Sequence, residues 1–81
     1  MLFVLIMDWQ DHIHSVPGIL SGKPVIKGTR ISVEFILRLL AAGWTEVQIL
    51  ENYESISLEA LRSVFAYAAD GMIEEKVYQF E

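Results

Sequence analysis

The hydrophobic pattern of the chain changes at Ser32. Before this residue, short apolar runs are interrupted by glycine and proline, whereas after it apolar side chains recur at the three- and four-residue spacing of an α-helix. The spacing predicts a first helix from residue 33 to residue 42, with Ser32 as its N-cap and Gly43 as its stop. Phe35 and Leu39 give this helix a second apolar face, so it lies centrally in the domain or is shared with a partner. Phe35 and Leu39 are therefore candidate interface residues.

Two further helices are predicted after the first. Thr45 and Gln48 fit a capping box, which predicts a short second helix reaching about residue 52. Ser57 is expected to cap a third helix that ends near residue 69, with Gly71 as its stop. The side chains expected to be buried are Val47, Ile49 and Leu50 in the second helix and Leu58, Leu61, Phe65 and Ala68 in the third, with Glu59, Arg62, Ser63, Ala66 and Asp70 facing away.

The region before the helices, residues 8–32, is expected to hold a short β-hairpin. Two β-branched runs, residues 25–26 and residues 29–31, flank Lys27-Gly28, a turn that favours positive φ at the glycine. Ile13 with Val16 is a candidate for a third short extended piece. The residues expected to build the turns are Gly22, Pro24, Gly28 and Arg30.

Together these elements predict a mainly α fold with a short N-terminal β-hairpin. We expect a single domain over residues 1–81, with the hairpin region at 8–32, a three-helix core at 32–70 and a weakly patterned tail at 72–81. A short second helix that meets the third through a small turn is compatible with a trihelical, homeodomain-like helix-turn-helix. Any small helical bundle gives the same sequence pattern, so that architecture stays open as an alternative.

Composition adds an expectation about association. The 81 residues are 53% hydrophobic and only 21% charged, which on so small a chain predicts an exposed apolar patch used as an interface. We therefore expect a homodimer. The net charge of −5 opposes generic binding to nucleic acid or to anionic membranes, although it leaves room for a local basic stripe. The absence of cysteine excludes disulfides and thiolate zinc sites.

The apolar run over the first seven residues ends at Asp8. A membrane span needs about 20 residues, and the basic start and small-residue cleavage site of a signal peptide are missing. We therefore expect a cytoplasmic protein with no membrane contact. A short edge strand and true initiation at Met7 explain the run equally well.

No pattern in the sequence indicates catalysis. Residues 18–24 resemble a phosphate-binding loop, but the glycine spacing is one residue short and Pro24 stands where a hydroxyl would hold magnesium. His12 and His14 share one face of an extended segment, and two imidazoles alone do not make a structural metal site. No nucleophile and base form a recognisable motif, so we expect no enzyme activity, no cofactor and no metal.

The most concentrated positive charge is the cluster of Lys23, Lys27 and Arg30. On an extended hairpin these residues would lie along one edge, where the lysines could contact phosphates or carboxylates of a partner. Arg30 is expected to form an ion pair with Glu34, which also has Arg38 at the i,i+4 spacing. If the third helix is a recognition helix, the candidate DNA contacts are Lys23, Lys27, Arg62 and Ser63.

The segment GKPVIKGTRI, residues 22–31, resembles the signature of the bacterial family named domain of unknown function 433. The resemblance continues along the helices and covers about residues 7–78. Proteins of this kind are similar to the antitoxins of type II toxin–antitoxin pairs and are often encoded beside a ribonuclease-like toxin of the PIN class. Their fold is grouped with homeodomain-like helix-turn-helix proteins.

The resemblance implies a homodimeric antitoxin that binds a PIN-like toxin and blocks its acidic magnesium site or its RNA cleft. Binding to its own promoter DNA would be a further role. The alternative is a protein-interaction module that keeps the helix-turn-helix scaffold and binds no DNA.

Overall fold

The computed structural model describes residues 8–79, with side chains described as far as residue 71. The apolar run at residues 1–7, for which an edge strand and initiation at Met7 are both expected explanations, lies outside the described residues. The described elements are the 3-10 turns η2 (Trp9–Asp11) and η3 (Leu20–Gly22), the strands β1 (Ile13–Ser15) and β2 (Pro24–Ile26), and the helices α1 (Val33–Ala41), α2 (Glu46–Asn52) and α3 (Leu58–Gln79).

A β-hairpin is present in the predicted region, but its two strands are β1 and β2 and not the runs at residues 25–26 and 29–31. They pair antiparallel with Ile13 opposite Ile26. The Thr29 hydroxyl donates a hydrogen bond to the Ile26 carbonyl at 2.8 Å and accepts one from the Ile31 amide at 2.9 Å. Gly28 has the expected positive φ, at +82°. The pairing expected between residues 25–26 and 29–31 is reduced to a hydrogen bond from the Ile26 amide to the Ile31 carbonyl at 3.0 Å and an isolated antiparallel bridge between Val25 and Ser32, because the chain then enters α1.

All three helices begin at the predicted caps. The Ser32 hydroxyl accepts a hydrogen bond from the Phe35 amide at 2.9 Å. The capping box of α2 is complete, with Thr45 and Gln48 each bonded to the backbone of the other. The Ser57 hydroxyl accepts from the Ala60 amide at 3.0 Å and so caps α3.

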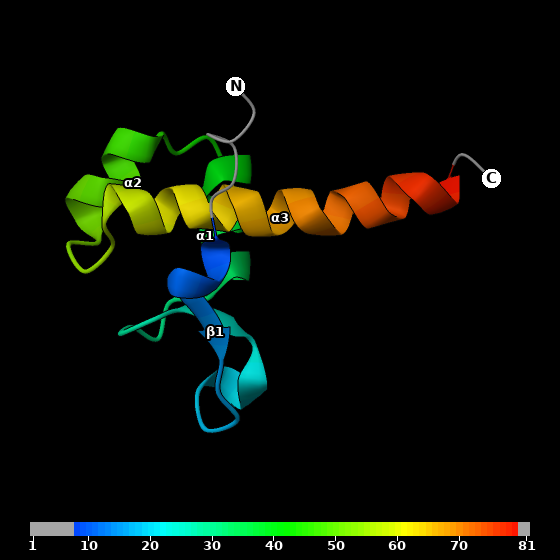
Figure 1. The fold of residues 1–81 in the computed structure, drawn as a ribbon. Coiled ribbons are helices and arrows are strands. Elements are labelled where there is room, and N and C mark those ends of the chain that lie inside the picture. Colours follow the sequence, from blue (N-terminus) through cyan, green and yellow to red (C-terminus); the bar gives the residue numbers. More distant parts are fainter. Residues whose placement is uncertain (1–7, 80–81) are drawn as a thin grey trace.

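The predicted end of the third helix is wrong. α3 does not stop at Gly71 but continues to Gln79, so most of the expected tail is helical. Figure 1 shows this second half of α3 extending away from the other elements. An internal glycine costs a helix only about 1 kcal/mol, and the good helix formers Glu74, Glu75 and Lys76 follow it.

The core lies where the hairpin, α1, α2 and the first half of α3 meet. The N-terminal turn is fastened to α3 by Trp9, whose Nε1 donates to Asp70 at 2.7 Å and whose ring meets Tyr67 edge-on at 4.7 Å between centroids. The buried apolar side chains are Ile13, Val25, Ile26, Val33, Ile36, Ile49, Ile56, Ala60, Leu61 and Val64.

The face of α3 that packs inward differs from the prediction. Leu61 is buried as predicted, but Leu58 and Phe65, which were also expected in the core, are 45% and 37% exposed, and Ala60 and Val64 are buried in their place. The small side chains of Ala60 and Ser63 allow α3 to pack closely against the isoleucine-rich core. Both stripes contain apolar residues at helical spacing, so periodicity alone does not choose between them. Val47 of α2 is likewise 61% exposed and not buried as expected.

Gly28→Ala is expected to lower the free energy of unfolding by about 1–2 kcal/mol, because alanine is disfavoured in the left-handed region. Gly18→Ala is the matched control, since it lacks the positive φ and an added methyl group meets no atom within 4 Å at either site. Urea denaturation of the two variants and the parent measures the difference. Equal stability of the two variants would show that the turn does not impose a left-handed conformation.

Candidate functional site

The helix-turn-helix face predicted to contact DNA corresponds to α2 and the start of α3. Of the two DNA contacts predicted on it, Arg62 is exposed and its Nη2 lies 3.8 Å from Glu46 Oε1. Ser63 is completely buried, and its hydroxyl donates to the Glu59 carbonyl at 2.9 Å. The prediction that Ser63 contacts DNA is therefore wrong, because the orientation of α3 turns this residue into the core.

The charge on this face is unfavourable for nucleic acid. Residues 44–69 carry four carboxylates and a single cation. The cation, Arg62, already has the Glu46 carboxylate as a neighbour. Proteins that bind DNA through a recognition helix present a basic surface to the phosphates. The four carboxylates are Glu46, Glu51, Glu54 and Glu59.

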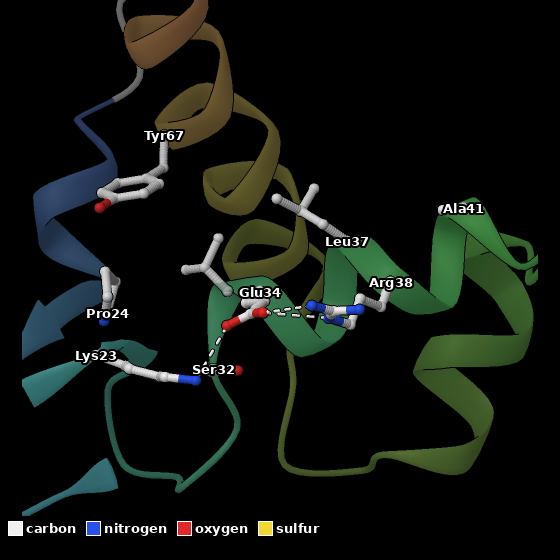
Figure 2. A pocket seen from close by; sticks show the side chains of 9 residues that line it. Lys23, Pro24, Ser32, Glu34, Leu37, Arg38, Ala41 and Tyr67 are labelled. Carbon is white, nitrogen blue, oxygen red and sulfur yellow. Dashed lines mark hydrogen bonds and ion pairs between the residues drawn. The ribbon is translucent and has the colours of Figure 1, made fainter. Parts of the chain in front are cut away.

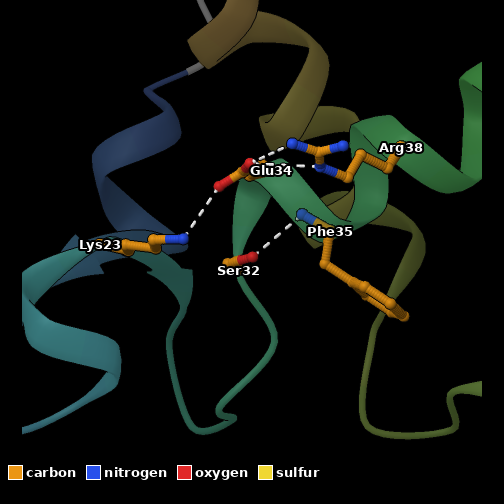
Figure 3. Close-up of polar contacts among 5 residues, drawn as sticks. All are labelled: Lys23, Ser32, Glu34, Phe35 and Arg38. Atoms are coloured by element: carbon orange, nitrogen blue, oxygen red, sulfur yellow. Dashed lines mark hydrogen bonds and ion pairs between the residues drawn. The ribbon is translucent and has the colours of Figure 1, made fainter.

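The basic cluster lies on the hairpin side, and its ion pairs differ from the prediction. Glu34 does not pair with Arg30. Its Oε1 accepts from Lys23 Nζ at 3.1 Å and its Oε2 accepts from Arg38 Nη2 at 2.8 Å (Figure 3). Arg38 is one helical turn beyond Glu34, as the i,i+4 spacing predicts. Lys23, the residue directly before β2, reaches Glu34 from the hairpin. Lys27 is exposed in the turn.

These two partners change the acidity of Glu34. The hydrogen bonds from Arg38 and then from Lys23 hold the pKa of the Glu34 carboxyl below its usual range. The carboxylate stays charged and paired at neutral pH, so it neutralises part of the positive charge of the cluster.

An apolar groove of about 420 Å³ runs beside this ion-pair network. Its floor is the α1 stripe of Val33, Leu37 and Ala41, and Tyr67 of α3 stands on its far side (Figure 2). Val33 and Ala41 are eight residue steps apart, so at ~1.5 Å per step this stripe is about 12 Å long. Lys23, Pro24, Ser32, Glu34 and Arg38 complete the lining. We call this feature the α1 groove.

A second hollow of about 560 Å³ adjoins the α1 groove and shares Lys23 and Ser32 with it. Phe35 lines this hollow, is 39% exposed, and meets Tyr53 edge-on at 5.8 Å between centroids. Leu39, the other candidate interface residue, is half-buried against the core. Leu20, Ser21, Arg30 and Ile31 complete the lining.

Sequence patterns predicted the two hollows beside α1 only in part. The apolar pattern identified α1 as apolar on most sides. It did not predict that Tyr67 would face the Val33–Ala41 stripe, because this contact depends on the orientation of α3. In the part of the chain that the structure describes, no three His, Cys, Asp or Glu side chains gather closely enough to hold a metal ion. None of the described helices is long and apolar enough to cross a membrane.

Comparison with known proteins gives consistent matches. The profile of the family described as "Protein of unknown function (DUF433)" matches residues 13–68. An uncharacterized protein of Sinorhizobium fredii (strain NBRC 101917 / NGR234), y4eO, is 38% identical over 59 residues, which are 73% of this chain and 27% of that protein. The chain therefore spans about a quarter of the length of this relative.

A solved structure is also similar. The crystal structure of a DUF433 member protein from Anabaena variabilis ATCC 29413 superimposes with a TM-score of 0.72 and 25% sequence identity. The similarity covers 85% of this chain and 70% of that one.

In a carbon-detected NMR titration, the pKa of Glu34 is expected to lie below the ordinary glutamate value of about 4.3. Replacing both partners, Lys23→Met with Arg38→Met, should raise its midpoint toward that value, whereas Lys27→Met should leave it unchanged. Because the folded-state pKa is lowered, the stability that the pairs contribute is present above the ordinary pKa and is lost as pH falls through the lowered one. An identical Glu34 midpoint in the double variant and the parent would contradict the network.

Proposed function

We propose that this chain, which belongs to the DUF433 family, is a protein-binding module that serves as the antitoxin of a type II toxin–antitoxin pair. Its partner is a PIN-like ribonuclease toxin, the class that the family resemblance implies. The contact surface on this chain is the α1 groove. The toxin is held there by apolar contacts along α1 and by the cations at the edge of the groove.

The observation that carries the proposal is the combination of an apolar floor with flanking cations. Val33, Leu37 and Ala41 offer a stripe of the kind that receives apolar side chains of a protein partner. Lys23 and Arg38 are 58% and 75% exposed along their side chains and can donate to further carboxylates. The acidic magnesium site of a PIN-class nuclease has the complementary charge.

The acidic helix-turn-helix face favours a scaffold without DNA binding over the reading of α3 as a recognition helix. Residues 44–69 carry four carboxylates against the single cation Arg62, and Ser63 is buried. Lys23 and Lys27 stay the candidate phosphate contacts for promoter DNA. With so few cations, we propose that such binding requires a basic toxin to add positive charge.

Co-expression with the product of an adjacent PIN-like reading frame, followed by pull-down of the tagged chain, tests the proposal. The parent chain is expected to capture the toxin. Arg38→Glu should reduce capture by about tenfold or more, because it reverses the charge at the edge of the groove. Arg62→Glu is the matched control, with the same change at an exposed arginine on the other face, and should capture normally.

Circular dichroism of both variants checks that each is folded. Capture that survives Arg38→Glu but not Arg62→Glu would place the toxin on the helix-turn-helix face and contradict the role of the groove. Absence of capture by the parent chain would overturn the antitoxin proposal itself.

A further inference from the structure

The charges of this protein are segregated between two surfaces. Residues 12–43 carry four cations against one carboxylate, a net charge of +3 with histidine neutral. Residues 44–69 carry four carboxylates against one cation, a net charge of −3. Figure 1 shows the hairpin and α2 on different sides of α3. The cations are Lys23, Lys27, Arg30 and Arg38, and the carboxylates are Glu46, Glu51, Glu54 and Glu59.

The negative surface has an apolar component of its own. Leu58, Arg62 and Phe65 lie on one side of α3, since residues four and three positions apart stack on a helix. The approach of Glu46 to Arg62, at 3.8 Å, brings the start of α2 beside this side of α3. Val47, in that first turn of α2, is 61% exposed, and Leu58 is 45% exposed. We call this surface the α2–α3 face.

Both surfaces are therefore apolar patches surrounded by charge, and the charges have opposite signs. A chain of this size leaves much apolar surface that its own core does not cover. Contact between two α1 grooves would oppose the cations of both copies, and contact between two α2–α3 faces would oppose their carboxylates. Like-charge juxtaposition at an interface is costly. Contact between the α1 groove of one copy and the α2–α3 face of another brings the apolar patches together and also places opposite charges next to each other.

We propose that, in the free protein, the α1 groove of one copy receives the α2–α3 face of a second copy. Exposed apolar side chains of the face, Leu58 among them, pack on Leu37 and Ala41 of the groove, whose base is closed by the buried Val33. Carboxylates beside the face meet Lys23 and Arg38 at the groove. The interface joins two different surfaces, so it is not a self-complementary contact of one patch with itself.

This proposal concerns the same groove as the toxin-binding proposal but does not depend on it. A second copy and a toxin would compete for the groove, so adding the toxin should release the second copy. Self-association is measured on the isolated chain, and toxin capture is measured by pull-down. The failure of either one therefore leaves the other standing.

Light scattering and sedimentation of the purified 81-residue chain test the proposal. The parent is expected to associate into species of at least twice the 9.2 kDa monomer mass at micromolar concentration, and more weakly as salt is raised. Arg38→Glu in the groove and Glu59→Lys in the face should each weaken association by about tenfold. Asp11→Lys, a charge change of the same size outside both surfaces, should associate as the parent does.

The decisive measurement is a mixture of the two variants. Arg38→Glu keeps an intact α2–α3 face and Glu59→Lys keeps an intact groove, so each supplies the surface that the other lacks. The mixture should form a one-to-one assembly more tightly than either variant forms with itself. A monomeric parent, variants that associate normally, or a mixture that associates no better than its components would each overturn the proposal.

Discussion

The orientation of α3 about its own axis is the constraint on which the rest of the structure depends. This helix turns the small side chains of Ala60 and Ser63 inward together with Leu61 and Val64. The same rotation places Tyr67 opposite the α1 stripe and in edge contact with Trp9. The α1 groove therefore exists because of how α3 is packed, and not because of α1 alone.

The orientation of α3 also determines which side chains lie on its outer side. With Leu61 and Val64 in the core, Leu58, Arg62 and Phe65 must face outward. Leu58 and Phe65, predicted to lie in the core, are partly exposed, whereas Ser63, predicted to contact DNA, lies in the core. The outer face of α2 and the start of α3 therefore combines apolar side chains with carboxylates, a composition that suits a protein partner better than nucleic acid.

Features decided by local chemistry were predictable from the sequence. Ser32, Thr45 and Ser57 cap their helices because each side-chain oxygen accepts a hydrogen bond from the backbone amide only three residues further along the chain. Gly28 adopts positive φ for an equally local reason. Features decided by packing were not predictable. The end of α3 beyond Gly71, the inward stripe of α3 and the approach of Lys23 to Glu34 all depend on neighbours that a period or a propensity does not reveal.

Cysteine labelling tests the orientation of α3 most directly, because the chain has no cysteine of its own and each variant then carries a single thiol. Under native conditions, Arg62→Cys and Leu58→Cys are predicted to react rapidly with a maleimide. Ser63→Cys, a nearly isosteric change at a buried position, is predicted to react slowly until denaturant is added. Labelling of Ser63→Cys as fast as that of Arg62→Cys would contradict the account, because the groove and the α2–α3 face both require Ser63 to point inward.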